Sequence, residues 1–249
     1  MSFIEINGLY HRFPDGTQGI EGIDLSIEKG EFVVIAGKNG SGKTTLLRHL
    51  NGLLSPSAGD VVVDGISVAK DPRRVRRMVG MVFQDADSQI VGETVFEDAA
   101  FGPENLKLDR QTIRGRVADA LSAVDLERLS DQRPHVLSVG EKRRLAIAGV
   151  LAMEPEVVVF DEPFSNLDYD GIRQVLTQML SLQRDGKTLV VTTHDLEKVI
   201  THADRLVILF DGEVVRDGLP SALLEETERF GVRQPCAARL GGEVPSWLD

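Results

Sequence analysis

Apolar residues recur along the chain in short runs, and their pattern changes from one region to the next. Residues 3–9 and 23–27 alternate apolar and polar side chains, which predicts half-exposed strands of an antiparallel lobe. Residues 157–161 and 188–193 are β-branched runs that flank a helical segment around 172–182. This alternation predicts βαβ units and a parallel sheet.

A long helical stretch interrupts these strands. An apolar run over 78–83 ends at Gln84. From residue 93 to 153 the apolar residues then recur at helical intervals of three and four, as at Ile113, Val117 and Leu121. Residues 207–210 and 213–215 predict a hairpin with an Asp-Gly turn. We therefore expect an α/β domain over residues 1–220, a helical subdomain inserted at about 85–153, and a short C-terminal extension over 221–249.

Composition narrows the class of protein. The longest apolar runs have strand length, far below the roughly 20 residues that cross a bilayer, and no signal peptide is expected at Met1 to Ile6. The single cysteine, Cys236, suits a reducing cytoplasm and is best interpreted as a small apolar filler. The net charge of −11 argues against a nucleic-acid binder, and we interpret the basic cluster 73–77 as a solvated helix face or turn.

A phosphate-binding loop follows the apolar run 32–36. Its residues match the GxxxxGK[ST] spacing: Gly37, Lys38, Asn39, Gly40, Ser41, Gly42, Lys43 and Thr44. Backbone N–H groups and the following helix N-terminus would hold a polyphosphate, Lys43 would reach the β- and γ-phosphates, and Thr44 would bind Mg²⁺. A merely structural glycine turn needs neither Lys nor Thr after it, nor a strand before it.

Two further segments carry candidate chemistry. The apolar strand 157–160 ends in Asp161 and Glu162, where Asp161 suits holding Mg²⁺ and Glu162 could polarise an attacking water. Leu137 to Glu141 predicts a Ser-capped helix start, which is either a simple capping box or an anion site.

The order of these motifs resembles the ATP-binding subunits of ABC transporters. The sequence carries the loop, Gln84, the LSxG-type signature at 137–141, Asp161-Glu162, the segment 165–168 and His194. The resemblance covers about residues 3–218 and implies a P-loop NTPase fold with a parallel core sheet, an antiparallel β lobe and an inserted helical lobe. It also implies a head-to-tail dimer, in which each ATP lies between the loop of one subunit and the signature helix of the other.

The resemblance assigns roles residue by residue. Lys43, Thr44, Thr45, Gln84 and Asp161 would bind ATP and Mg²⁺, Glu162 would be the general base, His194 would contact the γ-phosphate, Asp168 would communicate across the dimer, and Ser138 and Gly140 would serve the partner's ATP. Phe13, with Tyr10 as second choice, would stack on adenine. A hydrogen-bonded structural histidine is the alternative for His194.

The signature departs from the family pattern. Val139 stands where the first glycine is usual, and Glu141 replaces a glutamine. A β-branched residue cannot take the positive φ that glycine permits, and its bulk would lie beside the partner's γ-phosphate. We therefore expect a working signature that Val139 weakens.

Residues 82–106 resemble the energy-coupling factor ATPases, which include metal-ion and vitamin importers. The similarity extends to 230–235. It implies a peripheral subunit on the cytoplasmic face of the membrane, with a transmembrane coupling subunit and a substrate-binding membrane subunit as partners. A groove near 85–101 would receive a helix of the coupling subunit, and the acidic residues Asp85, Asp87, Glu93, Glu97 and Asp98 could meet basic side chains there or form an ordinary solvated face.

Three functions are therefore compared. The first is the ATP-hydrolysing subunit of an energy-coupling factor importer. The second is a catalytically impaired nucleotide-binding partner in a heterodimer, with Val139 impairing the site that its signature completes. The third is a soluble ABC protein outside transport, which the presence of one cassette and a short helical lobe disfavours.

Overall fold

The computed structural model describes residues 2–249. The strands are β1 (Ser2–Arg12), β2 (Gln18–Glu28), β3 (Phe32–Ala36), β4 (Ala58–Val63), β5 (Ile66–Ser67), β6 (Val79–Val82), β7 (Val157–Asp161), β8 (Thr188–Thr193), β9 (Arg205–Phe210) and β10 (Glu213–Gly218). The α-helices are α1 (Lys43–Leu50), α2 (Pro72–Met78), α3 (Val95–Asn105), α4 (Arg110–Ala123), α5 (Val139–Leu151), α6 (Tyr169–Arg184), α7 (Pro220–Leu223) and α8 (Cys236–Arg239). Short 3₁₀ turns η1 (Glu127–Leu129), η2 (Pro134–Val136), η3 (Leu196–Lys198), η4 (Ile200–His202) and η5 (Leu224–Phe230) complete the described chain.

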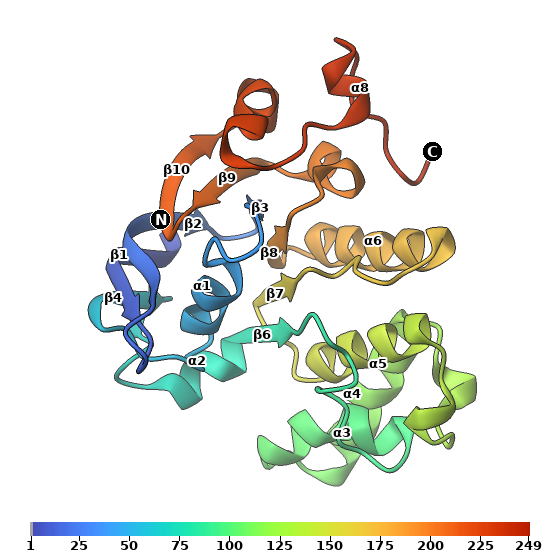
Figure 1. Ribbon diagram of the computed structural model, residues 1–249. Helices are drawn as coiled ribbons and strands as arrows, with labels where there is room; N and C mark the ends of the chain where they lie inside the picture. The colour runs from blue at the N-terminus through green and yellow to red at the C-terminus, as the bar shows by residue number, and fades with distance from the viewer. Residues whose placement is uncertain (1) are drawn as a thin grey trace.

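Two sheets form the body of the molecule. The larger has the strand order β10-β9-β3-β8-β7-β6, in which β9 to β6 run parallel and β10 pairs antiparallel with β9. The smaller is antiparallel, with the order β2-β1-β4-β5. The parallel sheet, the antiparallel lobe and the inserted helices α3 to α5, drawn in green in Figure 1, confirm the predicted fold class.

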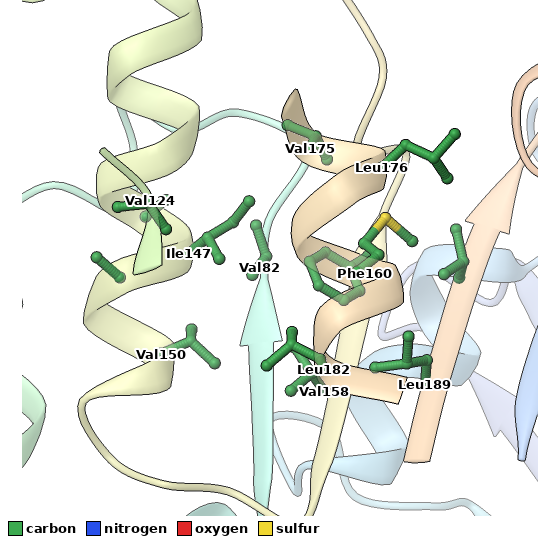
Figure 2. Packing of buried hydrophobic residues seen from close by; sticks show 14 of the residues in the cluster. Val82, Val124, Ile147, Val150, Val158, Phe160, Val175, Leu176, Leu182 and Leu189 are labelled. Carbon is green, nitrogen blue, oxygen red and sulfur yellow. The ribbon is translucent and has the colours of Figure 1, made fainter. Parts of the chain in front are cut away.

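The parallel strands are buried on both faces, which explains their unbroken apolar runs. Val158 and Phe160 of β7 pack toward α5 and α6, whereas Val157 and Val159 face the second core, around α1 and the antiparallel sheet. Figure 2 shows the first core, where Phe160 lies between the sheet and α6. The two cores fix α1 and the ends of β3, β7 and β8 relative to one another.

The ends of the sheet and the helical lobe follow local sequence signals. Asp211 and Gly212 have φ values of 49° and 87°, as a two-residue hairpin turn between β9 and β10 requires. Thr94 and Glu97 form a capping box at the start of α3. Cys236 is an exposed free thiol, so its interpretation as a small apolar filler is wrong.

The basic cluster lies on α2, where Arg73, Arg74, Arg76 and Arg77 are not buried. This confirms its interpretation as a solvated helix face. Within residues 2–249, no helix combines the length and apolar character needed to cross a membrane.

Candidate nucleotide site

The loop between β3 and α1 has the backbone of a phosphate cradle. Gly40 and Gly42 have φ values of 81° and 101°, a left-handed conformation that favours glycine, and Gly42 caps the N-terminus of α1. A Cβ atom at Gly37 would lie 2.4 Å from the Leu209 carbonyl oxygen and from Ser41 Oγ. These glycines are therefore required by conformation and by close approach.

Lys43 lies inside this loop. Its Nζ donates hydrogen bonds to the carbonyl oxygens of Gly37 (2.7 Å) and Lys38 (3.2 Å) and lies 3.6 Å from Glu162 Oε1. Burial lowers the pKa of Lys43, whereas the negative charges of Glu162 and Asp161 oppose that effect. The ammonium group is thus held at the mouth of the loop among oxygen acceptors.

Thr44 and Asp161 bring two oxygen groups together at the carboxyl end of β7. The Thr44 hydroxyl lies 3.0 and 2.8 Å from the two carboxylate oxygens of Asp161. Thr192 Oγ1 of the adjacent strand β8 donates to Asp161 Oδ1 at 2.8 Å. Because Asp161 is buried, its carboxylate has a fixed orientation.

Glu162 and His194 are also brought together, since β7 and β8 are neighbours and each residue follows its strand. His194 Nδ1 lies 2.9 Å from Glu162 Oε2, and an ionised carboxylate makes this nitrogen the donor. Glu162 is buried and has a φ of 48°, an unusual value for a residue other than glycine. Its main-chain N–H is anchored to the Thr192 carbonyl oxygen at 3.1 Å.

A cavity of about 510 Å³ opens above the loop. Its lining includes these sequence-predicted residues: Phe13, Asn39, Gly40, Gly42, Lys43, Thr44, Thr45, Gln84 and Glu162. Gln84 also lines a neighbouring cavity of about 480 Å³, together with Asp161 and Thr44. Ser41 is buried beside Gly37, so it supports the loop from behind.

Sequence reasoning missed Thr17, Gln18 and Gly19, which line the same cavity. A Cβ atom at Gly19 would lie 2.7 Å from the Phe13 ring and 3.4 Å from Thr45 Cγ2. Glycine is therefore needed for the ring to occupy its position at the cavity wall. Its φ is not positive, and no local sequence signal distinguishes this glycine from others.

The signature residues and Asp168 do not line this cavity. Ser138 caps α5 by accepting a hydrogen bond from the Glu141 N–H at 3.2 Å, and Glu141 Oε2 accepts from the Ser138 N–H at 2.8 Å. The predicted capping box is therefore present. Asp168 caps α6 by accepting a hydrogen bond from Gly171 N–H at 2.9 Å.

The conformational argument about Val139 was wrong. Val139 is the first residue of α5, and neither Val139 nor Gly140 has a positive φ. A β-branched residue therefore fits the backbone at this position, and the expected strain is absent there. The Val139 side chain itself is exposed, so Val139 can weaken the signature only through its bulk beside the partner's nucleotide.

Comparisons with known proteins show the family of the chain. Residues 20–165 match the family described as ABC transporter. The chain is 41% identical to the energy-coupling factor transporter ATP-binding protein EcfA of Methanocaldococcus jannaschii over 96% of this chain and 88% of that protein. This chain belongs to the ABC transporter family, in the energy-coupling factor ATP-binding group. Membership confirms the resemblance inferred from the motif order.

Two solved structures are also similar. The cbiO1 protein of Clostridium perfringens, part of the ABC transporter complex cbiONQ, matches with a TM-score of 0.82 and 37% identity over 92% of each chain. A dimeric ATP-binding cassette in a post-hydrolysis state, bound to ADP and Pi, matches with a TM-score of 0.79 and 31% identity over 87% of this chain and 98% of that chain. The similarity thus extends through nearly all of the fold.

Proposed function

We propose that this protein is the ATP-hydrolysing subunit of an energy-coupling factor importer for a metal ion or a vitamin. The observation that carries the proposal is the placement of Glu162, whose carboxylate lies between Lys43 Nζ and His194 Nδ1 at the mouth of the phosphate loop. A carboxylate at that point can accept a proton from a water molecule that attacks a bound phosphate.

The other residues of the cavity have positioning roles in this proposal. The N–H groups of the loop from Gly37 to Gly42 hold the phosphates, and Lys43 stabilises the negative charge of the transferred phosphoryl group. The Phe13 ring stacks on the adenine. His194 holds the Glu162 carboxylate and contacts the γ-phosphate, whereas Gln84 orients the water.

The donor set at Thr44, Gln84 and Asp161 fits Mg²⁺. All three side chains offer oxygen, and the hydroxyl of Thr44 already lies 2.8 Å from Asp161 Oδ2. Mg²⁺ is usually bound in proteins through one or two side chains and the phosphates of a nucleotide, which is consistent with this small donor set. When bound, Mg²⁺ would neutralise phosphate charge.

The proposal includes a second ATPase subunit. Ser138 and Gly140 lie at the positive dipole end of α5, and they are outside the lining of their own chain's cavity. A partner subunit would therefore bring its nucleotide to them. The similarity to a dimeric cassette with bound ADP and Pi supports the dimer itself.

The membrane partners remain part of the proposal. An apolar groove of about 320 Å³ runs between the parallel sheet and the helical lobe, and exposed Leu53, Val91 and Phe101 line it. We assign this groove to a helix of the transmembrane coupling subunit, beside a substrate-binding membrane subunit. The protein would then act as a peripheral subunit on the cytoplasmic face of the membrane.

The structure removes Asp98 from the acidic set predicted for this groove, whereas Asp85, Asp87, Glu93 and Glu97 are exposed. Asp98 is buried and accepts hydrogen bonds from the N–H groups of Val91 and Gly92. Asp87 pairs with Lys142 at 2.6 Å, and Glu97 belongs to the α3 capping box. Only Asp98 is therefore unable to face a partner, and we propose that the apolar residues of the groove and the exposed carboxylates around it both serve docking.

Phosphate release by the purified protein tests the catalytic assignment. Glu162→Gln should abolish hydrolysis and keep nucleotide affinity within a few-fold, because the amide retains the shape of the side chain but cannot accept the proton. Glu156→Gln is a matched control, since Glu156 precedes the opposite end of β7 and pairs with Lys29. Hydrolysis by the Glu162→Gln variant would refute the proposal, and a wild-type dimer that binds but never hydrolyses ATP would favour the impaired-partner alternative.

A further inference from the structure

Arg143 is a buried cation in the helical lobe. Its exposed fraction is 3%, and its guanidinium donates hydrogen bonds to the main-chain carbonyl oxygens of Phe83 and Gln84, both at 2.5 Å. Its Nε finds no hydrogen-bond partner among the described residues. Burial of a guanidinium is unfavourable unless its donors are satisfied, so these two carbonyl groups, together with the negative charges of Asp85 and Asp161, stabilise the buried charge.

The two ends of this contact belong to different parts of the fold. Arg143 lies in the second turn of α5, the helix that Ser138 caps. Phe83 and Gln84 follow the end of β6 in the parallel sheet, and β6 and α5 lie side by side (Figure 1). Gln84 in turn lines the nucleotide cavity and the neighbouring cavity at Asp161. One side chain therefore connects the backbone beside the nucleotide to the helix that presents the signature.

The chemistry of the contact makes it sensitive to backbone orientation. Both acceptors are uncharged peptide groups, and a planar guanidinium can satisfy two adjacent carbonyls at once only when both point toward it. A rotation of either peptide would leave a buried donor unpaired, which is unfavourable by the desolvation of that group. The Gln84 backbone therefore cannot turn freely while α5 stays fixed.

A second link between the same elements offers a comparison. Lys142, the preceding residue of α5, pairs with Asp87 at 2.6 Å, but the Asp87 side chain is largely exposed. Solvent-exposed ion pairs contribute little and tolerate rearrangement. Of these two links, the buried Arg143 contact is thus the better suited to transmit a movement of the Gln84 backbone to α5.

We propose that Arg143 is a positioning residue that makes the Gln84 loop and the Ser138 end of α5 move together. The inference rests on the proposed function, in which Gln84 serves the chain's own nucleotide and Ser138 serves the partner's nucleotide. Nucleotide binding in a subunit's own cavity then shifts the Ser138 end of its α5. That end is the part of the subunit that contacts the partner's nucleotide. Without the Arg143 contact, this route of coupling between the two nucleotide sites of a dimer is lost.

Hydrogen exchange of the full-length protein tests this link without requiring hydrolysis. In the wild type, ADP binding should change the exchange rate of the α5 N-terminal amides by at least about three-fold, and in Arg143→Gln this response should be lost although ADP still binds. Lys142→Gln, the matched control, should keep the response. A full response in Arg143→Gln, or none in the wild type, would overturn the inference.

Steady-state hydrolysis gives a second readout. Arg143→Gln should lower the Hill coefficient for ATP toward one and reduce kcat about ten-fold, with the concentration for half-saturation changed less than about three-fold. Arg143→Lys keeps the positive charge but cannot donate to both carbonyl groups as the planar guanidinium does, so it should give intermediate values. It replaces Arg143→Gln in this experiment if the glutamine variant is unstable. A wild type without hydrolysis refutes the proposed function, whereas wild-type cooperativity in both Arg143 variants refutes this inference alone.

Discussion

The carboxylate of Glu162 lies 2.9 Å from Nδ1 of His194. The two side chains differ in environment, since 53% of the His194 side chain is exposed but only 9% of the Glu162 side chain. The histidine therefore reaches the buried carboxylate from the open side of the site. Its contact fixes the orientation of Glu162 and leaves Nε2 available to a ligand.

His194→Ala should lower kcat for ATP hydrolysis by about two orders of magnitude, because the proposed base loses its orienting partner and the γ-phosphate loses a contact. ADP affinity should stay within a few-fold, since the loop and Phe13 are untouched. Phosphate release and equilibrium binding check the two expectations separately. A variant that retains half of the wild-type kcat would show that His194 is only structural.

Gly19→Ala should weaken ATP binding by displacing the Phe13 ring, from which the new methyl carbon would lie only 2.7 Å away. We expect a loss of about ten-fold in affinity, equal to about 1.4 kcal/mol. Phe13→Ala should cause a similar loss, and the double variant should lose no more than Phe13→Ala alone. Fully additive losses would mean that Gly19 acts independently of the ring.

Val139→Gly and Val139→Ala separate bulk from backbone effects at the signature. Both remove bulk at the helix start, so both should raise ATPase activity of the assembled dimer several-fold if Val139 weakens the site. Val139→Gly should also have a lower free energy of unfolding than Val139→Ala, by up to about 1 kcal/mol, because position 139 is helical. Unchanged or lower ATPase activity in both variants would show that Val139 does not weaken the site.

His49 should make the protein less stable in mild acid. It is buried against His11, with ring centroids 4.8 Å apart, and burial followed by the nearby His11 lowers its pKa to about 4. The unfolded chain, with a histidine pKa near 6.5, binds the proton more readily than the native state. The contribution of neutral His49 to the free energy of unfolding is therefore complete above about pH 6.5. It is lost progressively as the pH falls toward 4.

Urea denaturation should show a loss of about 2 kcal/mol from this group between about pH 7 and pH 5. His49→Leu provides the comparison, because neither ring nitrogen has a hydrogen-bond partner in the described part of the chain. The leucine variant should show a correspondingly flatter pH dependence. Identical slopes for the two proteins would mean that His49 is not the responsible group.

Phe101→Ser should reduce co-purification with the membrane partners by at least about ten-fold, because Phe101 is an exposed aromatic residue at the proposed docking groove. ADP affinity should not change. Leu219→Ser, at an exposed leucine that does not line this groove, is the control. Equal loss of assembly in both variants would indicate a general defect of solubility or folding.

Much of the fold could be predicted because local patterns specify it. The unbroken apolar runs at β7 and β8 and the Asp211-Gly212 turn each have a signal within a few residues. The loop at Gly37 to Thr44 is equally local, since its glycines and Lys43 are adjacent in the chain. The order of the motifs along the chain, which resembles that of ABC transporter ATPases, then predicted which distant residues lie in one site, including Glu162 and His194.

The features that sequence could not reveal depend on tertiary contacts. Gly19 matters only because the Phe13 ring folds back over it. Arg143 looks like one more surface cation beside Lys142, and only the packing of α5 against β6 buries it. Asp98 was predicted to face a partner but instead accepts hydrogen bonds from its own chain. The backbone at Val139 was misjudged because helical φ values extend to the first residue of α5.

Glu162 also has a thermodynamic consequence for the whole molecule. A left-handed φ at a residue other than glycine is unfavourable by about 1 kcal/mol or more, and burial of its carboxylate adds to this. The native state is therefore less stable than the same fold would be with a relaxed residue at this position. In the proposed function, this loss of stability is offset by the catalytic role of the glutamate.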